Sequence, residues 1–141
     1  DKLADLNNVV AIKEASGDLS QVAKMAELCG DRIAIYSGND DQIVPILSLG
    51  GAGVVSVLAN ILPEETHNIC EKYFLGEVIE SRNLQLKYLS LANSLFIETN
   101  PIPVKTAMNF NCGPLRLPLC EMEDSNLVIL EENLKANGLI K

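Results

Sequence analysis

Three short apolar segments, each followed by a turn of small polar residues and then by a helical pattern, constrain the fold of this chain most strongly. The expected strands span 9–13, 33–36 and 53–57. They are rich in β-branched residues and apolar at successive positions, which is typical of parallel strands covered on both faces. The repeated strand-helix order predicts an α/β fold, either a (β/α) barrel or an open doubly wound sheet.

Capping residues indicate where the helices of these units begin. Asp18 can cap the first helix, and Gln21 stands at the answering position of a capping box. Asn39 and Gln42 repeat this pattern in the second unit. The third helix has Pro63 in its first turn, where a missing N–H is tolerated. The expected helices span about 19–29, 40–49, 63–75, 77–93, 104–109 and 125–136.

The pattern changes after the third unit. Residues 1–76 are predicted to hold three strand-helix units, and residues 77–141 a helical domain. Three parallel strands leave two sheet edges unpaired, whereas a barrel needs eight strands. We therefore interpret the chain as the C-terminal portion of a (β/α)8 TIM barrel followed by a helical C-terminal domain, and as part of something larger.

Composition excludes several classes of partner. The formal net charge is −8 with a sequence pI of about 4.6, so no basic surface is predicted for nucleic acid or for an anionic membrane. No signal peptide or membrane-spanning stretch is visible. Four widely spaced cysteines fit free thiols in a reducing compartment, which predicts a cytoplasmic protein. The cysteines are Cys29, Cys70, Cys112 and Cys120.

No metal site is predicted either. The single histidine, His67, has no cysteine or second histidine at the spacing that zinc ligands adopt. Asp40 and Asp41 are adjacent carboxylates, but they stand where a helix is expected to begin, and carboxylates are favoured there without any ion.

Lys13 is the main candidate for chemistry because it ends the first expected strand. In a barrel, active-site groups lie where strands end and helices begin. Desolvation there would favour the neutral amine of a lysine, which can attack a ketone to form a Schiff base. The alternative is a surface lysine that extends into solvent and pairs with Glu14 or Asp18.

Two further segments occupy the same position in the next units, so all three should lie on one side of the sheet. Ser37 and Gly38 follow the second strand, and their backbone N–H groups could receive a carboxylate. Val55 and Ser56 end the third strand and offer backbone carbonyls and a hydroxyl.

Five blocks of sequence, in this order, resemble the dihydrodipicolinate synthase family of pyruvate-dependent class I aldolases. Together they run through essentially the whole chain. They are Ile12-Lys13-Glu14-Ala15-Ser16-Gly17-Asp18, Tyr36-Ser37-Gly38-Asn39-Asp40-Asp41, Gly53-Val54-Val55-Ser56-Val57-Leu58-Ala59-Asn60, Asn100-Pro101-Ile102-Pro103-Val104-Lys105 and Gly113-Pro114-Leu115-Arg116-Leu117-Pro118.

The resemblance implies a fold and an activity. The family has a (β/α)8 barrel with a C-terminal helical domain and is usually a homotetramer. Lys13 would form an imine with pyruvate, whose enamine adds to aspartate semialdehyde, in lysine and diaminopimelate biosynthesis. Gly38 and Val55 would line the substrate pocket with their backbone. No cofactor is implied, since the imine is covalent. The family's other catalytic groups belong to its N-terminal half, so this chain alone is expected to be incomplete and inactive.

Other interpretations stay open. Related lyases that cleave N-acetylneuraminate or keto-sugar acids use the same imine. A non-catalytic fragment that only takes part in assembly is a third possibility. One departure from the family pattern lies between Lys105 and Gly113, where the chain is about three residues short.

Overall fold

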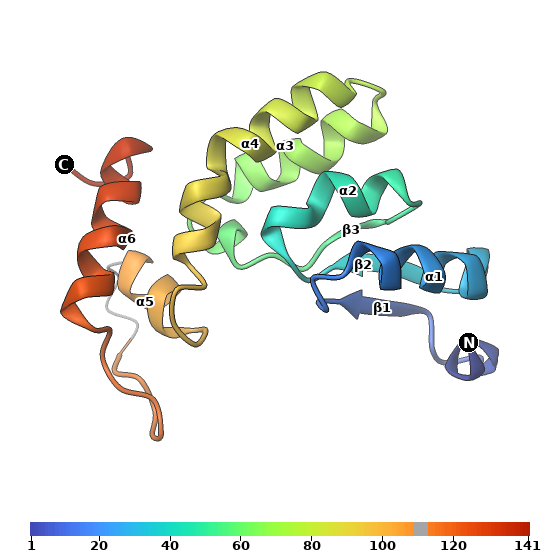
Figure 1. Cartoon of the computed structure of the whole chain (residues 1–141), viewed down its shortest axis with the longest axis horizontal. Coiled ribbons are helices and arrows are strands. Elements are labelled where there is room, and N and C mark those ends of the chain that lie inside the picture. Colours follow the sequence, from blue (N-terminus) through green and yellow to red (C-terminus); the bar gives the residue numbers. More distant parts are fainter. Residues whose placement is uncertain (109–112) are drawn as a thin grey trace.

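The computed structural model describes residues 1–108 and 113–141. Within these ranges the strands form a parallel sheet in the order β1-β2-β3, with a helix after each strand and only helices beyond the third unit (Figure 1). The strands are β1 (Ala11–Glu14), β2 (Ala34–Ser37) and β3 (Gly53–Val54). The α-helices are α1 (Leu19–Cys29), α2 (Ile43–Ser48), α3 (Pro63–Phe74), α4 (Val78–Ser94), α5 (Ile102–Met108) and α6 (Asp124–Ala136). Short 3-10 helices are η1 (Lys2–Asp5), η2 (Gly30–Arg32), η3 (Asp40–Gln42) and η4 (Leu58–Asn60).

Local chemistry sets the ends of these helices, as the sequence predicts for the first and third units. The Asp18 carboxylate accepts hydrogen bonds from the N–H groups of Ser20 (2.9 Å) and Gln21 (3.3 Å), so α1 begins at Leu19. Pro63 stands at the start of α3, where no helical hydrogen bond needs its nitrogen. The α/β class with a parallel sheet is thus confirmed.

The second unit begins differently from the prediction. Asn39 precedes η3 without a side-chain capping bond, and α2 starts only at Ile43. The side-chain amide of Gln42 does not form a capping box with Asn39. It donates instead to the carbonyl of Gly17 (2.9 Å), in the turn after β1. A tertiary contact between two neighbouring turns has replaced the local cap.

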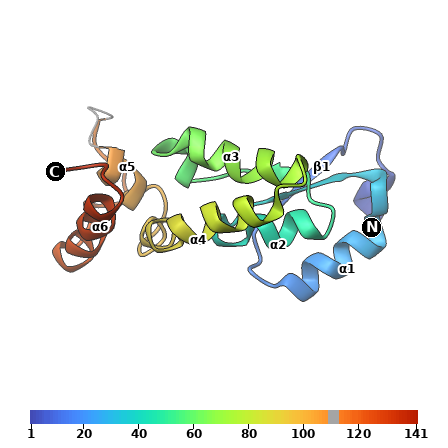
Figure 2. The same ribbon diagram turned by 90° about the horizontal axis from the view of Figure 1, so that it is seen from above.

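Within the described ranges, α1 and α2 pack against one and the same face of the sheet. Side chains alternate along a strand, so Ile12 and Ile35 share one face, where they pack with Val22 of α1 and Ile46 of α2. Ala11 lies on the opposite face and is exposed. The expectation of strands covered on both faces is therefore wrong for the described chain. Figure 2 shows α1 and α2 gathered on the same side of the strands.

Helix α4 joins the strand-bearing part to the helices at the far end. On one side it packs along α3, where the Ser81 hydroxyl donates to the Ile69 carbonyl (2.6 Å). On the other side Leu91 and Leu95 form a buried cluster with Leu130 of α6. Figure 1 shows α5 and α6 beyond this end of α4, opposite the N-terminus. The predicted division between residues 76 and 77 stays a prediction.

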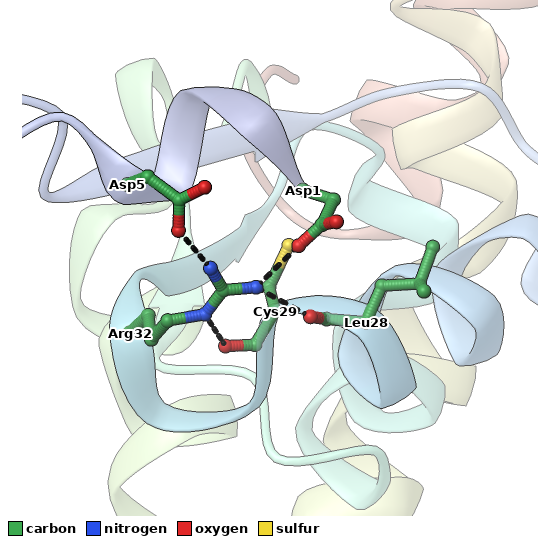
Figure 3. A network of polar contacts seen from close by, with 5 residues as sticks. All are labelled: Asp1, Asp5, Leu28, Cys29 and Arg32. Carbon is green, nitrogen blue, oxygen red and sulfur yellow. Dashed lines mark hydrogen bonds and ion pairs between the residues drawn. The ribbon is translucent and has the colours of Figure 1, made fainter.

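Arg32 ties the N-terminal η1 to the end of α1. Its guanidinium contacts the carboxylates of Asp1 and Asp5 and donates to the carbonyls of Leu28 (2.7 Å) and Cys29 (3.3 Å), as Figure 3 shows. Exposed ion pairs contribute little to stability, typically about 0–1 kcal/mol. The network therefore orients the segment that leads into β1 rather than stabilising the core.

Among the described residues, no helix is both long enough and apolar enough to cross a membrane. The shortened stretch predicted between Lys105 and Gly113 falls mainly on residues 109–112, which lie outside the described residues.

The two faces of α4 provide a test of this packing. Leu91 is fully buried and Leu86 is 57% exposed on the same helix. We predict that Leu91→Ala lowers the free energy of unfolding by about 2–5 kcal/mol, because it leaves a cavity. Leu86→Ala, the same chemical change on the exposed face, should alter it by less than about 0.5 kcal/mol. Urea unfolding followed by circular dichroism measures both, and equal losses would contradict the assignment of the two faces.

Candidate functional site

Lys13 lies on the face of the sheet that the helices leave open. Parallel pairing places Lys13 beside Tyr36 of β2, and Tyr36 beside Gly53 of β3, so these residues form one row across the sheet. The side chain of Lys13 is exposed in the described chain. The expectation that this amine is sheltered from water is therefore wrong here, because α1 and α2 pack against the opposite face.

Gly38 lies directly under the Lys13 side chain. A Cβ atom added to Gly38 would come within 2.8 Å of Lys13 Cε, 2.7 Å of Ala15 Cβ and 2.9 Å of the Glu14 carbonyl oxygen. Such distances are shorter than van der Waals contact, so only glycine fits without a shift. The structure thus brings Lys13 and Gly38 together at the end of β2, and the amine-bearing chain extends toward the second strand rather than away from it.

The N–H groups of this turn are already used. Gly38 donates to the Glu14 carbonyl (2.6 Å), and Asn39 donates to the Ser37 hydroxyl (3.2 Å). The Gly38 N–H therefore already has a partner within the fold, and the carboxylate-binding role predicted for Ser37 and Gly38 stays a prediction. What Gly38 offers in addition is the space through which the Lys13 side chain passes.

Val55 lies next to this turn, immediately after β3. Its N–H donates to the Ser37 carbonyl (2.8 Å), and its side chain is 48% exposed. Lys13 near the end of β1, Gly38 just after β2 and Val55 just after β3 therefore lie at the same end of the sheet, as the sequence predicts for their positions. Their roles in substrate binding stay predictions.

The surface-pair interpretation of Lys13 has no support in the described residues. Glu14 is buried on the opposite face, where Oε1 accepts from the Ser16 N–H (3.0 Å) and the Gln21 side chain (3.3 Å). Asp18 caps α1. Both carboxylates are thus engaged elsewhere, and neither is among the ion pairs that the described residues form with a lysine.

Asp40 is a functional candidate that sequence reasoning missed. It begins η3, as expected for a helix start, but its side chain is 3% exposed, and its Oδ2 accepts from the N–H groups of Val57 (3.0 Å) and Leu58 (2.9 Å). It also borders a cavity of about 240 Å³ between the turn after β2 and the end of α4. No local pattern could reveal this, because its partners are 17 and 18 residues away.

Comparisons with known proteins agree with this arrangement. Residues 1–137 match the profile of the Dihydrodipicolinate synthetase family. A 4-hydroxy-tetrahydrodipicolinate synthase of Clostridium perfringens is 98% identical over 144 residues, covering all of this chain and 50% of the relative. That alignment is three positions longer than the chain. The sequence likewise predicts that this chain is about three residues shorter than the family pattern.

Solved structures show the same likeness. The chloride-inhibited dihydrodipicolinate synthase of Acinetobacter baumannii, complexed with pyruvate, has a TM-score of 0.92 and 34% identity over 99% of this chain and 49% of that one. A monomeric dihydrodipicolinate synthase variant has a TM-score of 0.89 and 39% identity over 98% of this chain and 48% of that one.

The chain thus spans about half the length of the relatives it matches. That this is their C-terminal half stays a prediction. Since the family profile covers nearly the whole sequence, the chain belongs to the dihydrodipicolinate synthetase family.

Proposed function

We propose that this chain carries the imine-forming lysine of a 4-hydroxy-tetrahydrodipicolinate synthase. The observation that carries the proposal is the position of Lys13, whose side chain passes over Gly38 at the carboxyl ends of parallel strands, on the face away from the helices. In a closed barrel this face is the interior, and the carboxyl ends of the strands form the active-site mouth. The names of the relatives support the same activity.

The proposed chemistry needs no cofactor. The Lys13 amine adds to the keto carbon of pyruvate, and loss of water leaves an imine. The imine withdraws electrons from the adjacent methyl group, which loses a proton and becomes an enamine carbon. That carbon adds to the aldehyde of aspartate semialdehyde. The substrate's own amine then attacks the imine carbon, releases Lys13 and closes the ring.

Completion of the site by the rest of a barrel is part of the proposal. Lys13 and Ala11 are exposed on the open face of the sheet. Because parallel sheets are normally buried on both faces, further parts of the protein are expected to pack against this face. We propose that the described strands are the last three of a (β/α)8 barrel, because within the described ranges only helices follow β3. The other strands would shelter Lys13 and add the remaining substrate-binding groups.

The location and assembly of the protein follow from the same family. A cytoplasmic homotetramer is proposed, although the monomeric variant among the relatives shows that this fold also occurs without partners. The relatives described above bear the synthase name, which favours the synthase over the sialic-acid and sugar-acid lyases. No observation singles out a purely structural role.

Trapping of the imine tests the proposal. In the full-length Clostridium perfringens relative, borohydride in the presence of pyruvate should attach a reduced pyruvyl group to the lysine matched to Lys13, and peptide mass spectrometry locates it. Lys13→Arg should abolish trapping and turnover, because a guanidinium forms no such imine. The isolated 141-residue chain should show no synthase turnover.

Lys24 supplies a matched control. It is an exposed lysine on α1, paired with Glu27, and lies away from the open face. Lys24→Arg should leave trapping unchanged. Modification of Lys24 at the same rate as Lys13 would overturn the proposed role of Lys13.

Gly38→Ala tests the proximity of Gly38 to the amine. The added methyl group would clash with Lys13 Cε and with the Glu14 carbonyl, which is backbone and cannot rotate away. Overpacking of this kind costs about 1–3 kcal/mol in stability, and displacement of the lysine should also slow trapping. Ala15→Gly removes the closest contact, so in that background the stability cost of Gly38→Ala should fall. If the effects of Gly38→Ala and Ala15→Gly on stability were additive in a double-mutant cycle, positions 38 and 15 would not be in contact.

A further inference from the structure

Asp40 is a buried carboxylate whose hydrogen bonding is only half satisfied. Its Oδ2 accepts two backbone hydrogen bonds, whereas its Oδ1 is buried with no partner in the described residues. Burying a carboxylate is costly unless hydrogen bonds compensate, and a buried atom left without a partner requires an explanation. An apolar residue would avoid this cost, so the position indicates a requirement other than core stability.

The two N–H groups that Asp40 holds belong to the segment that follows Val55. Val55 itself is fixed through its N–H to the Ser37 carbonyl (2.8 Å), and Val57 and Leu58 are fixed through Asp40. The Val55–Ser56 backbone is therefore held at one end by the last residue of β2 and at the other by the turn that follows β2. This is also the turn whose Gly38 makes room for Lys13.

The turn that carries Asp40 is itself anchored from behind. Gln85 of α4 donates to the Asp41 carbonyl (2.6 Å) and accepts from the Val44 N–H (2.6 Å). Gln42 links the same turn to Gly17. Asp40 thus fixes the backbone beyond β3 relative to this anchored turn. It does so through two charge-assisted hydrogen bonds, which are roughly twice as strong as neutral ones.

We propose that Asp40 is a positioning residue, which sets the place of the Val55–Ser56 backbone relative to Lys13 and so tunes the affinity and reactivity of the site toward a 2-oxo acid. It does so without touching the substrate. The proposal rests on the imine chemistry proposed for Lys13, and it goes beyond it by assigning a role to a carboxylate outside the pocket.

The test compares two adjacent aspartates in the full-length Clostridium perfringens relative, at the matched positions. Asp40→Ala should slow borohydride trapping of pyruvate per folded molecule, and raise the KM for pyruvate, by about tenfold to a hundredfold, since small misplacements cost up to about that factor. Asp41→Ala removes the same charge from an exposed side chain of the same turn and should leave both values within about twofold.

Asp40→Asn separates positioning from simple stability. Its amide oxygen can still accept from Val57 and Leu58, although without the charge, so trapping should be only a few-fold slower than in the unaltered enzyme. Folded fraction is measured by circular dichroism, and rates are expressed per folded molecule. A merely structural residue would lower the melting temperature without changing these normalised rates.

The outcomes are distinct. Failure of the unaltered enzyme to trap pyruvate at Lys13 would overturn the proposed function itself. Normal trapping there, with unchanged rates in folded Asp40→Ala, would overturn the role of Asp40 alone. Should Asp40→Ala not fold, Asp40→Asn decides: slower trapping than in Asp41→Asn supports the proposal, and equal trapping overturns it.

Discussion

The parallel pairing of three short strands determines where every candidate group lies. Hydrogen bonds between β1, β2 and β3 place Lys13 beside Tyr36 and Tyr36 beside Gly53. Since all three strands run in the same direction, the turns that follow them meet at one end of the sheet. Because side chains alternate along a strand, packing of α1 and α2 against one face places Lys13 on the other.

Two buried carboxylates hold the turns at this end. Glu14, immediately after Lys13, accepts from the Ser16 N–H and from Gln21, and Asp40 accepts from residues beyond β3. Each has one oxygen buried without a partner in the described residues. Burial of each carboxylate therefore costs desolvation free energy. In return, each accepts hydrogen bonds that are stronger than those of a neutral side chain and holds its turn more firmly.

Local signals in the sequence were enough to predict most of the elements. The cap at Asp18 and the proline at position 63 depend on the nearest few residues, so α1 and α3 begin where the sequence predicts. The alignment of Lys13, Gly38 and Val55 at one end of the sheet also follows from periodicity and strand direction alone.

Non-local contacts explain the predictions that were wrong. The apolar composition of a strand predicts burial on both faces, but burial depends on which other segments pack against each face. The solvent exposure of Lys13 could therefore not be deduced from its own strand. Asn39 reads as a helix cap, yet Gln42 reaches Gly17, 25 residues away. Asp40 begins a helix as predicted, but the partners of its carboxylate, Val57 and Leu58, lie beyond β3 and could not be predicted locally.

The helical part of the chain also takes part in forming the site. Gln85 of α4 donates to the Asp41 carbonyl, beside Asp40, and accepts from the Val44 N–H at the start of α2. The other end of α4 packs with α6 through Leu91 and Leu130. A contiguous set of packed residues therefore connects the far helices to the backbone at Val55. In the proposed barrel, the missing strands would shelter the amine from water, whereas α4 and Asp40 set the geometry around it. Since the two contributions would come from different parts of the molecule, the turns around Lys13 can be held in place while the lysine itself still lies open to solvent.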